Sequence, residues 1–338
     1  MVSFTIFLVL TLGSVSAFDR KFADWVSEYK IAFKNNEHYL SVLKKWTDNN
    51  VFIENVNSHN LSYSLGHNQF SGMDRDEYRQ YLIQFPFEKK RNGITIKSSV
   101  NVNVEVETVP DSVNWVTKGG VTPVKDQGQC GSCWSFSTTG ALEGVFFNSE
   151  GNLQIFSEQQ LVDCDNLKNG GHDHGCNGGL MDNAFEWIAK NGGLCLESAY
   201  PYVSGTTQKP NANCAKTCSV VKGSDISDFV DVESSSDAAM VAAIAQQPVS
   251  IAIEADQREF QLYKSGVFTG ECGTNLDHGV LVVGYGSDYY LVKNSWGVTW
   301  GDQGYIQLGR GSQYNNGQGQ CGILLQGSYP IKGTVGSL

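Results

Sequence analysis

Cysteine is absent from the first 129 residues of the 338-residue chain, whereas nine cysteines follow from Cys130 onward. A long hydrophobic run is also missing, because the most apolar stretch, residues 4–12, is far shorter than the roughly 20 residues of a membrane-spanning helix. Positive charge is in deficit: the net charge is −11, and the whole excess lies in residues 109–338. These absences argue against a membrane anchor and against nucleic acid or an anionic membrane as a partner.

The first 17 residues contain no lysine or arginine, but their apolar core is followed by small residues that end at Ala17. This order predicts a secretory signal peptide over residues 1–17. In a secreted chain, nine cysteines indicate disulfide bridges with one thiol left over. The odd thiol is either part of an intermolecular bridge or a reactive group.

The cysteine-free part after the signal peptide is predicted to be helical. Apolar residues at helical spacing predict helices over residues 22–33 and 37–57. A third helix starts at Asp74, where Glu77 completes a capping-box pattern, and it buries Tyr78 and Leu82. Because such a unit is small and has no disulfide, we expect it to lean on another part of the chain.

The pattern of residues 85–108 is typical of an extended linker. Its basic triplet at residues 89–91 is either a processing site or a solvated charge cluster. The sequon at residues 60–62 is the only one in the chain, so Asn60 is the expected glycosylation site.

Residues 127–136 place a glycine-rich turn directly before an apolar run that predicts a helix, with Cys133 in its first turn. Unpaired backbone N–H groups and the positive end of the helix dipole favour an anion at this place. Such a setting lowers the pKa of a cysteine and makes it a thiolate nucleophile. Cys130 and Cys133 also form a C-x-x-C pair, so these residues alone leave a redox motif or half of a zinc site equally open.

Histidine is scarce after residue 108, where three are found. His172 and His174 lie in a glycine-rich loop, which we expect to be exposed to solvent and not to bind a metal. His278 instead opens a predicted strand, and Asn294 ends another, close to Trp296.

Beyond about residue 224 the pattern changes from helical to alternating. Before it, helices are predicted over residues 158–163, with a capping box at Ser157 and Gln160, and over residues 180–190. After it, strands are predicted over residues 249–253, 279–283, 289–292 and 305–308, with one helix over residues 237–245. The expected fold class is α+β, with a helical half followed by an antiparallel, barrel-like half.

The Gln127–Trp134 motif, the histidine about 145 residues after Cys133 and the asparagine 16 residues further on resemble the papain family of cysteine proteases, cathepsin L-like members in particular. The resemblance implies a signal peptide (1–17), an inhibitory propeptide (18–108) and a papain-like peptidase domain (109–338). Within that domain it implies a helical left subdomain (109–223) and a β-rich right subdomain (224–338).

The propeptide part of the resemblance is carried by two motifs. Half of the long-helix motif and a second motif over residues 66–70 fit the sequence; the first is matched by Trp46, Asn49, Ile53 and Asn57. Two positions depart from the family pattern, since Val42 stands in place of an arginine and Gly72 in place of an aspartate. The resemblance implies that the propeptide inhibits the enzyme and that protonation of its carboxylates, Asp74, Asp76 and Glu77 among them, weakens docking in acid.

The resemblance also implies the catalytic roles. Cys133 would be the nucleophile, in a thiolate–imidazolium pair with His278. Asn294 would orient the imidazole, Trp296 would shield that hydrogen bond, and the Gln127 side chain would help to hold the oxyanion.

Substrate would bind along a backbone edge and in a pocket for the second residue before the scissile bond. The expected substrate-binding residues are Gly178, Gly179, Leu180, Met181, Ala252, Leu276, Asp277, Trp296 and Gln326. Gln326 would form the pocket floor, where a neutral side chain predicts a preference for Leu over Phe and poor cleavage after Arg.

The disulfide pairing implied by the resemblance leaves Cys133 as the free thiol. The expected bridges are Cys130–Cys176, Cys164–Cys214, Cys195–Cys218 and Cys272–Cys321.

These expectations describe a cysteine endopeptidase of the secretory pathway, found in a lysosome, a vacuole or outside the cell. Its expected partners are polypeptide substrates, its own propeptide and cystatin-type inhibitors; we expect a monomer that uses no cofactor or metal. Two alternatives are a non-enzymatic protein of the same fold and a thiol oxidoreductase that uses Cys130 and Cys133.

Overall fold

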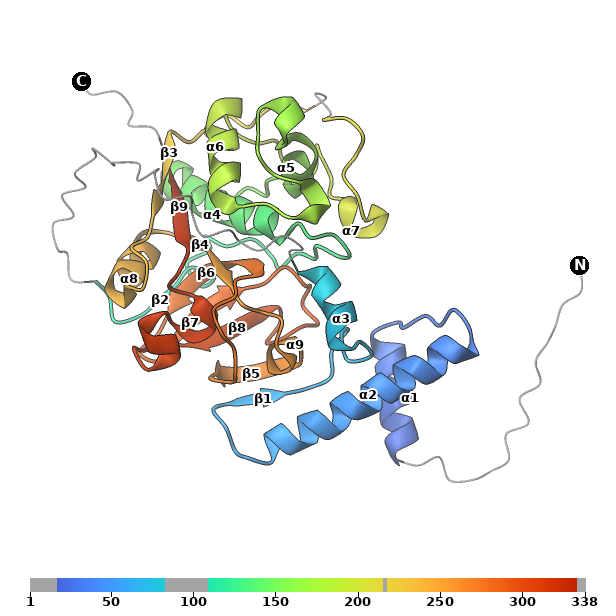
Figure 1. Ribbon diagram of the computed structural model, residues 1–338. Helices are drawn as coiled ribbons and strands as arrows, with labels where there is room; N and C mark the ends of the chain where they lie inside the picture. Colours follow the sequence, from blue (N-terminus) through green and yellow to red (C-terminus); the bar gives the residue numbers. More distant parts are fainter. Residues whose placement is uncertain (1–16, 83–108, 215–217, 333–338) are drawn as a thin grey trace, which may run out of the picture.

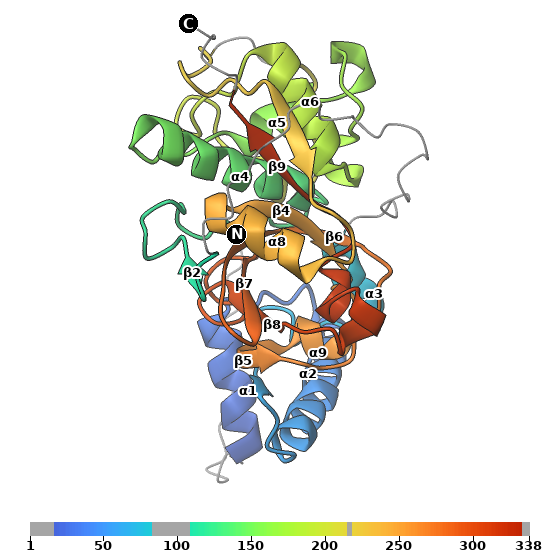
Figure 2. The same cartoon turned by 90° about the vertical axis from the view of Figure 1, so that its left-hand side faces the viewer.

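The computed structural model describes residues 17–82, 109–214 and 218–332, and Figure 1 shows their arrangement. In Figure 2 the chain forms three tiers, with helices α5 and α6 at one end, the sheet in the middle and helices α1 and α2 at the other end. Nearly all of the predicted signal peptide and the predicted linker with its basic triplet lie outside the described residues. No helix in the described part of the chain is long and apolar enough to cross a membrane.

The N-terminal segment, residues 17–82, contains α1 (Ala17–Glu28), α2 (Asn36–Asn57), strand β1 (Tyr63–Leu65), α3 (Arg75–Tyr78) and a 3-10 turn (Arg79–Tyr81). Helix α1 ends five residues before the predicted end, and the chain turns at Lys30, whose φ is 52°. The predicted capping box of α3 is present, because Asp74 accepts from the backbone of Glu77 and Glu77 returns the bond.

The helical tier is built around α4 (Cys133–Glu150), which is joined by α5 (Glu158–Cys164), α6 (Met181–Asn191) and α7 (Ser204–Thr207). The first 14 residues of α4 are all buried. Two glycines allow this helix to lie close to the sheet: a Cβ atom at Gly140 would come within 2.7 Å of Leu281, and one at Gly144 within 2.5 Å of Pro248.

The start of α5 differs from the predicted capping box. Ser157 caps the helix by accepting from the backbone of Gln160 at 3.0 Å. The Gln160 side chain does not return the bond; it accepts from the Cys195 backbone at 2.8 Å. Gln160 therefore joins α5 to the segment that follows α6.

The sheet has the strand order β1-β5-β8-β7-β6-β4-β9-β3, and β2 pairs with β6. Its strands after β1 are β2 (Val113–Asn114), β3 (Asp228–Asp231), β4 (Val249–Ile253), β5 (Tyr263–Phe268), β6 (His278–Tyr285), β7 (Tyr289–Lys293), β8 (Tyr305–Gly309) and β9 (Gly327–Ile331). Helices α8 (Asp237–Gln246) and α9 (Arg258–Gln261) lie between strands. All pairs are antiparallel except β5 with β8.

Three strands pair with or contact elements on the other side of the subdomain boundary expected at residue 224. Strand β2 comes early in the chain but pairs with β6 in the sheet, and β3 and β9 contact α6 of the helical tier. Strands near both ends of the domain thus contact the half to which they were not assigned. The subdomain boundary at residue 224 stays a prediction.

Four disulfides lie outside the N-terminal segment and pair the same cysteines that the sequence resemblance implies. They are Cys130–Cys176, Cys164–Cys214, Cys195–Cys218 and Cys272–Cys321. Cys133 is the free cysteine of the chain, and it is buried.

Candidate active site

Cys133 is the first residue of α4, where its thiol faces the sheet. The sulfur accepts a hydrogen bond from the Gly279 backbone N–H at 3.3 Å, which joins α4 to β6. Ser132 caps the helix without a side-chain hydrogen bond, so the helix end has no competing oxygen from that residue. The thiol thus lies at the positive end of a buried helix, and its hydrogen-bond donor, Gly279, directly follows His278 in the chain.

His278 is held in a fixed orientation by two side chains from the end of β7 and beyond. Its Nε2 lies 2.8 Å from Oδ1 of Asn294, an acceptor, so Nε2 carries the proton. The indole of Trp296 stacks on the imidazole at 4.5 Å and covers this bond. Nδ1 has no hydrogen-bond partner among the described residues and is the nitrogen left to face Cys133.

Gln127 is locked against the same loop. Its Oε1 accepts from the Ser295 hydroxyl at 2.6 Å, and its backbone N–H donates to the Ser295 carbonyl at 2.8 Å. Its Nε2 donates to the Cys130 carbonyl and to the Tyr81 carbonyl, both at 3.0 Å. The side-chain donor expected to face an oxyanion is therefore engaged by a backbone carbonyl of the N-terminal segment.

The N-terminal segment covers the site with aromatic side chains. The rings of Phe70 and Tyr78 pack edge-on against Trp296 at 5.2 and 5.7 Å. Gln69 donates to the Trp296 carbonyl at 2.7 Å, and Tyr78 donates to the Ala255 carbonyl at 2.9 Å. Further along, β1 extends the sheet by pairing with β5, as the side-by-side strands of Figure 1 show.

Burial disfavours the charged forms of both candidate catalytic groups, the Cys133 thiol and the His278 imidazole. Burial raises the pKa of the Cys133 thiol to about 12 and lowers the pKa of His278 to about 4. Both groups are consequently neutral in this state, so the thiolate–imidazolium pair expected from the sequence is not favoured while the segment is in place. Burial also raises the pKa of the adjacent Asp277 to about 8.

Carboxylates of the N-terminal segment do not make the docking contacts that the sequence suggested. Asp74 and Glu77 bind Lys45 of α2, at 3.0 and 2.5 Å, within the segment itself. Asp76 is exposed. Among the described residues, the ion pairs that cross to the rest of the chain have the opposite polarity, because Arg75 and Arg79 of the segment bind Asp256 at 2.9 and 2.6 Å.

The residues expected to bind substrate lie on both sides of Cys133. Gly178 and Gly179 precede α6, Met181 begins it, and a Cβ atom at Gly279 would meet the Met181 sulfur at 3.1 Å. Opposite them, the Ala252 backbone donates to the Gln326 carbonyl at 3.1 Å. Leu276 is 9% exposed, whereas Leu180 and Gln326 are half-buried. The set therefore lines the junction of α6 with the β4 side of the sheet.

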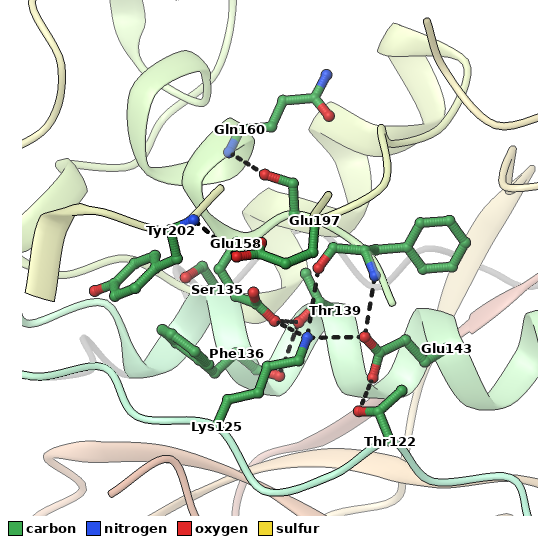
Figure 3. A network of polar contacts seen from close by, with 12 residues as sticks. Thr122, Lys125, Ser135, Phe136, Thr139, Glu143, Glu158, Gln160, Glu197 and Tyr202 are labelled. Atoms are coloured by element: carbon green, nitrogen blue, oxygen red, sulfur yellow. Dashed lines mark hydrogen bonds and ion pairs between the residues drawn. The ribbon is translucent and has the colours of Figure 1, made fainter. Parts of the chain in front are cut away.

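A network of buried charges lies behind the site (Figure 3). Lys125 binds Glu143 at 2.9 Å and Glu158 at 2.5 Å, and Thr139 also donates to Glu158. Burial alone would lower the pKa of Lys125, but the two carboxylates outweigh it and raise this pKa. The adjacent Lys293 forms no ion pair with a carboxylate among the described residues; it donates to the Thr122 hydroxyl at 3.0 Å, and burial lowers its pKa to about 8. The network ties the segment that leads to Gln127, residues 122–125, to α4, α5 and β7.

His172 and His174, the two histidines of the glycine-rich loop, are exposed as expected. No group of three or more metal-ligating side chains occurs in the described ranges of the chain. Two participants were missed from the sequence. Ser295 carries no signal beyond following Asn294, and Tyr81 acts through its backbone carbonyl, which no side-chain pattern reveals.

The fold and site define a cysteine protease covered by an N-terminal segment, and comparison with known families supports both parts. Residues 109–331 match the papain family cysteine protease model, and residues 22–78 match the cathepsin propeptide inhibitor domain. The chain belongs to the papain family of cysteine proteases, which hydrolyse peptide bonds, and carries the inhibitory propeptide domain.

Similar proteins share most of the chain. A probable cysteine protease RD21B of Arabidopsis thaliana is 44% identical over 95% of this chain and 68% of its own length. The senescence-specific cysteine protease SAG39 of Oryza sativa is 40% identical over 90% of this chain and 88% of its own length. For the cysteine proteinase RD21A of Arabidopsis thaliana, at 46% identity, the chain spans 60% of that protein's length.

Solved structures confirm the papain-like fold. The proform of the ragweed pollen cysteine protease Amb a 11 aligns with a TM-score of 0.82 and 35% identity, over 95% of both chains. A stem bromelain precursor aligns with a TM-score of 0.80 and 34% identity, over 94% of this chain and 100% of that one. A Carica candamarcensis cysteine protease in complex with E-64 is 42% identical, with a TM-score of 0.61 over 66% of this chain and 99% of that one.

Proposed function

We propose that the chain is the zymogen of a cysteine endopeptidase of the secretory pathway, with Cys133 as nucleophile. Cys133 attacks the peptide carbonyl, and His278 protonates the leaving amine through Nδ1. His278 then activates the water that hydrolyses the thioester. Asn294 keeps the imidazole in the tautomer and orientation that this exchange needs.

One observation carries the proposal: the Gln127 Nε2 donates to a backbone carbonyl of the propeptide, that of Tyr81. An N–H group that donates to a peptide carbonyl at this position can also donate to the oxyanion of a tetrahedral intermediate. The propeptide therefore occupies the donor that a substrate needs. Inhibition and catalysis compete for the same hydrogen bond.

Departure of the propeptide also changes the electrostatics of the pair. Phe70 and Tyr78 keep water from Trp296 and from the imidazole beneath it. When these rings leave, water returns, and the burial that now holds both groups neutral is relieved. The helix end and the imidazole can then stabilise the thiolate.

The remaining expectations belong to the same proposal. The pocket formed by Leu180, Met181, Ala252 and Leu276, with Gln326 at its floor, favours Leu over Phe and disfavours Arg. Cystatin-type inhibitors, a monomeric state, and a lysosomal, vacuolar or extracellular destination are proposed on the same family grounds.

The test is peptide hydrolysis by the acid-matured enzyme. Cys133→Ser should abolish turnover, and Gln127→Ala should lower kcat by roughly 10²–10³-fold, the usual loss for one oxyanion donor. Gln129→Ala, at a neighbouring glutamine that contacts the Tyr81 hydroxyl instead of its carbonyl, is the matched control. Hydrolysis that survives Cys133→Ser, or a Gln127→Ala enzyme with unchanged kcat, contradicts the proposal.

A further inference from the structure

Two buried aspartates lie on the loop that leads from α5 to the proposed substrate edge. Asp165 directly follows α5 and is 0% exposed, and Asp173, further along the loop, is 2% exposed. The two carboxyl groups are in hydrogen-bonding contact with each other. Apart from this contact, Oδ2 of each has no donor among the described residues. A contact between two carboxyl groups is a hydrogen bond only when one of them carries a proton.

The other oxygen of each aspartate holds the backbone of the loop. Oδ1 of Asp165 accepts from the His172 N–H at 3.0 Å. Oδ1 of Asp173 accepts from the Leu180 N–H at 3.0 Å and from the Asn183 side chain at 2.9 Å. The pair thus connects the end of α5 to the first turn of α6.

Asp173 also lies against the substrate edge itself. A Cβ atom at Gly179 would come within 2.7 Å of the Asp173 carboxyl carbon and 2.6 Å of the Trp134 ring. The Gly179 backbone is therefore confined between the carboxyl group and the indole. Movement of Asp173 would displace Gly179 together with Leu180, whose N–H it binds.

The charges around this pair differ from those around Glu143 and Glu158, the buried acids behind the candidate active site. Glu143 and Glu158 share Lys125, but no lysine or arginine forms an ion pair with Asp165 or Asp173 within the described ranges. The titratable groups on the neighbouring segments are the exposed Lys168, His172 and His174 on the loop and Asp182 in the first turn of α6, and Trp134 of α4 lies against the same Gly179 as Asp173. Of these, His172 favours the ionised form of Asp165. Without a buried cation, two touching carboxylates cannot both be ionised at low cost.

We propose that Asp165 and Asp173 are positioning residues that hold the substrate-binding edge, residues 178–180, by sharing one proton. The proposal rests on the proposed function for the meaning of that edge. When the shared proton is lost, the two carboxylates repel each other, the contact opens, and the edge loosens. Substrate affinity then falls while the chemistry at Cys133 is retained.

The direction of the pH dependence follows from burial. Burial raises the pKa of Asp165 to about 6, and burial together with the charge of Asp165 raises the pKa of Asp173 well above its usual 3.8. The closed loop therefore binds protons that an open loop has already released. Its stability is greatest at acid pH, falls as pH rises above about 4, and is lowest once the pair is fully ionised.

Asp173→Asn tests the proposal, because the amide keeps an oxygen for Leu180 and donates to Asp165 at every pH. In the matured wild-type enzyme, we expect KM to rise between pH 5.5 and 7.5 more than kcat falls. In Asp173→Asn, this rise should shrink by roughly tenfold, the equivalent of one pKa unit. Glu186→Gln, which removes a partly exposed carboxylate from α6, should behave as wild type. Equal KM profiles for wild type and Asp173→Asn would overturn the proposal.

A second measurement does not depend on peptidase activity. Hydrogen exchange of the Gly179 and Leu180 amides in the full chain, corrected for intrinsic exchange, should be at least several-fold faster at pH 7.5 than at pH 5.5. Asp165→Asn, with the donor and acceptor roles exchanged, should remove this difference if Asp173→Asn does not fold. Exchange that is independent of pH in the wild type would refute the shared proton. Exchange that changes while KM does not would instead refute the assignment of residues 178–180 as the substrate edge.

Discussion

The two halves of the propeptide are held in different ways. Most of its first half, α1 with the N-terminal part of α2, has a core of its own, formed by Phe22, Trp25, Val42 and Trp46, whereas Ile53 and Val56 near the end of α2 belong to the main core. The second half, residues 63–82, belongs to the main core of the protein through Tyr63, Leu65, Phe70, Tyr78 and Leu82. In Figure 2, α1 and α2 accordingly stand at the far end of the sheet from α5 and α6.

We therefore expect the first half to stabilise the propeptide and the second half to inhibit the enzyme. The second half makes the contacts with the candidate active site that we propose block it, including the hydrogen bond from Gln127 to the Tyr81 carbonyl and the packing of Phe70 on Trp296. The first half supports it: Trp25 donates to the Asn68 carbonyl at 2.8 Å, and Asn49 donates to the Ser71 carbonyl at 2.8 Å. A substitution that weakens the contacts of the second half should therefore release peptidase activity directly. A substitution in the first half should act indirectly, by destabilising the fold that supports the second half.

Phe70→Ala should have the largest effect, because Phe70 is 2% exposed and packs on both Tyr78 and Trp296. Truncating a buried phenylalanine costs about 3–5 kcal/mol, which corresponds to a hundredfold or greater weakening of docking. Uncleaved 18–338 carrying this change should hydrolyse peptides at neutral pH. Val51→Ala, on the exposed face of α2, is the control, and the uncleaved chain that carries it should remain inactive. If the uncleaved Phe70→Ala chain were as inactive as the uncleaved wild type, Phe70 would not be what keeps the second half of the propeptide docked.

Gly72→Asp restores the residue type of the family motif but should destabilise this chain. A Cβ atom at Gly72 would lie 2.8 Å from both Trp25 and Val42, so the two departures from the motif are in contact with each other. Overpacking of this kind costs about 1–3 kcal/mol. Thermal unfolding of the uncleaved chain should shift to lower temperature, and Val42→Ala should partly restore it. An unchanged unfolding temperature in Gly72→Asp would show that this contact is not tight.

His67, in the second half, contacts α2 of the first half and should make the stability of the propeptide depend on pH. It stacks on Trp46 at 4.3 Å and contacts Asn50 at 3.1 Å, and burial, with Lys21 and Lys264, lowers its pKa from 6.5 to about 4. The folded propeptide thus needs neutral His67. This stabilisation is complete above pH 6.5, declines as the pH falls, and is lost near pH 4. His67→Gln should shift acid maturation to lower pH, whereas the exposed His59→Gln should not; maturation at the wild-type pH in both variants would exclude His67 as a trigger.

Asp256→Asn should have the smallest effect. It removes the partner of Arg75 and Arg79, but both arginine side chains are more than half exposed, so water screens the pairs. We expect the uncleaved chain to mature only a few-fold faster at constant pH, with a reduced dependence on salt. A change as large as that of Phe70→Ala would mean that charge, and not aromatic packing, holds the second half.

The sequence motifs could single out Cys133, His278 and Asn294 as candidate catalytic residues because each stands at the end of a strongly patterned element. Strand β5 was missed because its burial does not alternate, and β9 because it contains glycine and proline, which disfavour strands. The neutral state of the covered pair and the contact between Asp165 and Asp173 depend on burial and on the path of a loop. Neither quantity is encoded in local residue patterns.

The central claim is that the second half of the propeptide seals a reactive Cys133, and E-64 labelling followed by peptide mapping tests it most directly. In the acid-matured enzyme, we predict stoichiometric modification at Cys133. In uncleaved 18–338 at neutral pH, we predict that Cys133 remains unmodified on the same time scale. Equal labelling of the two forms, or modification at a cysteine other than Cys133, would contradict the account.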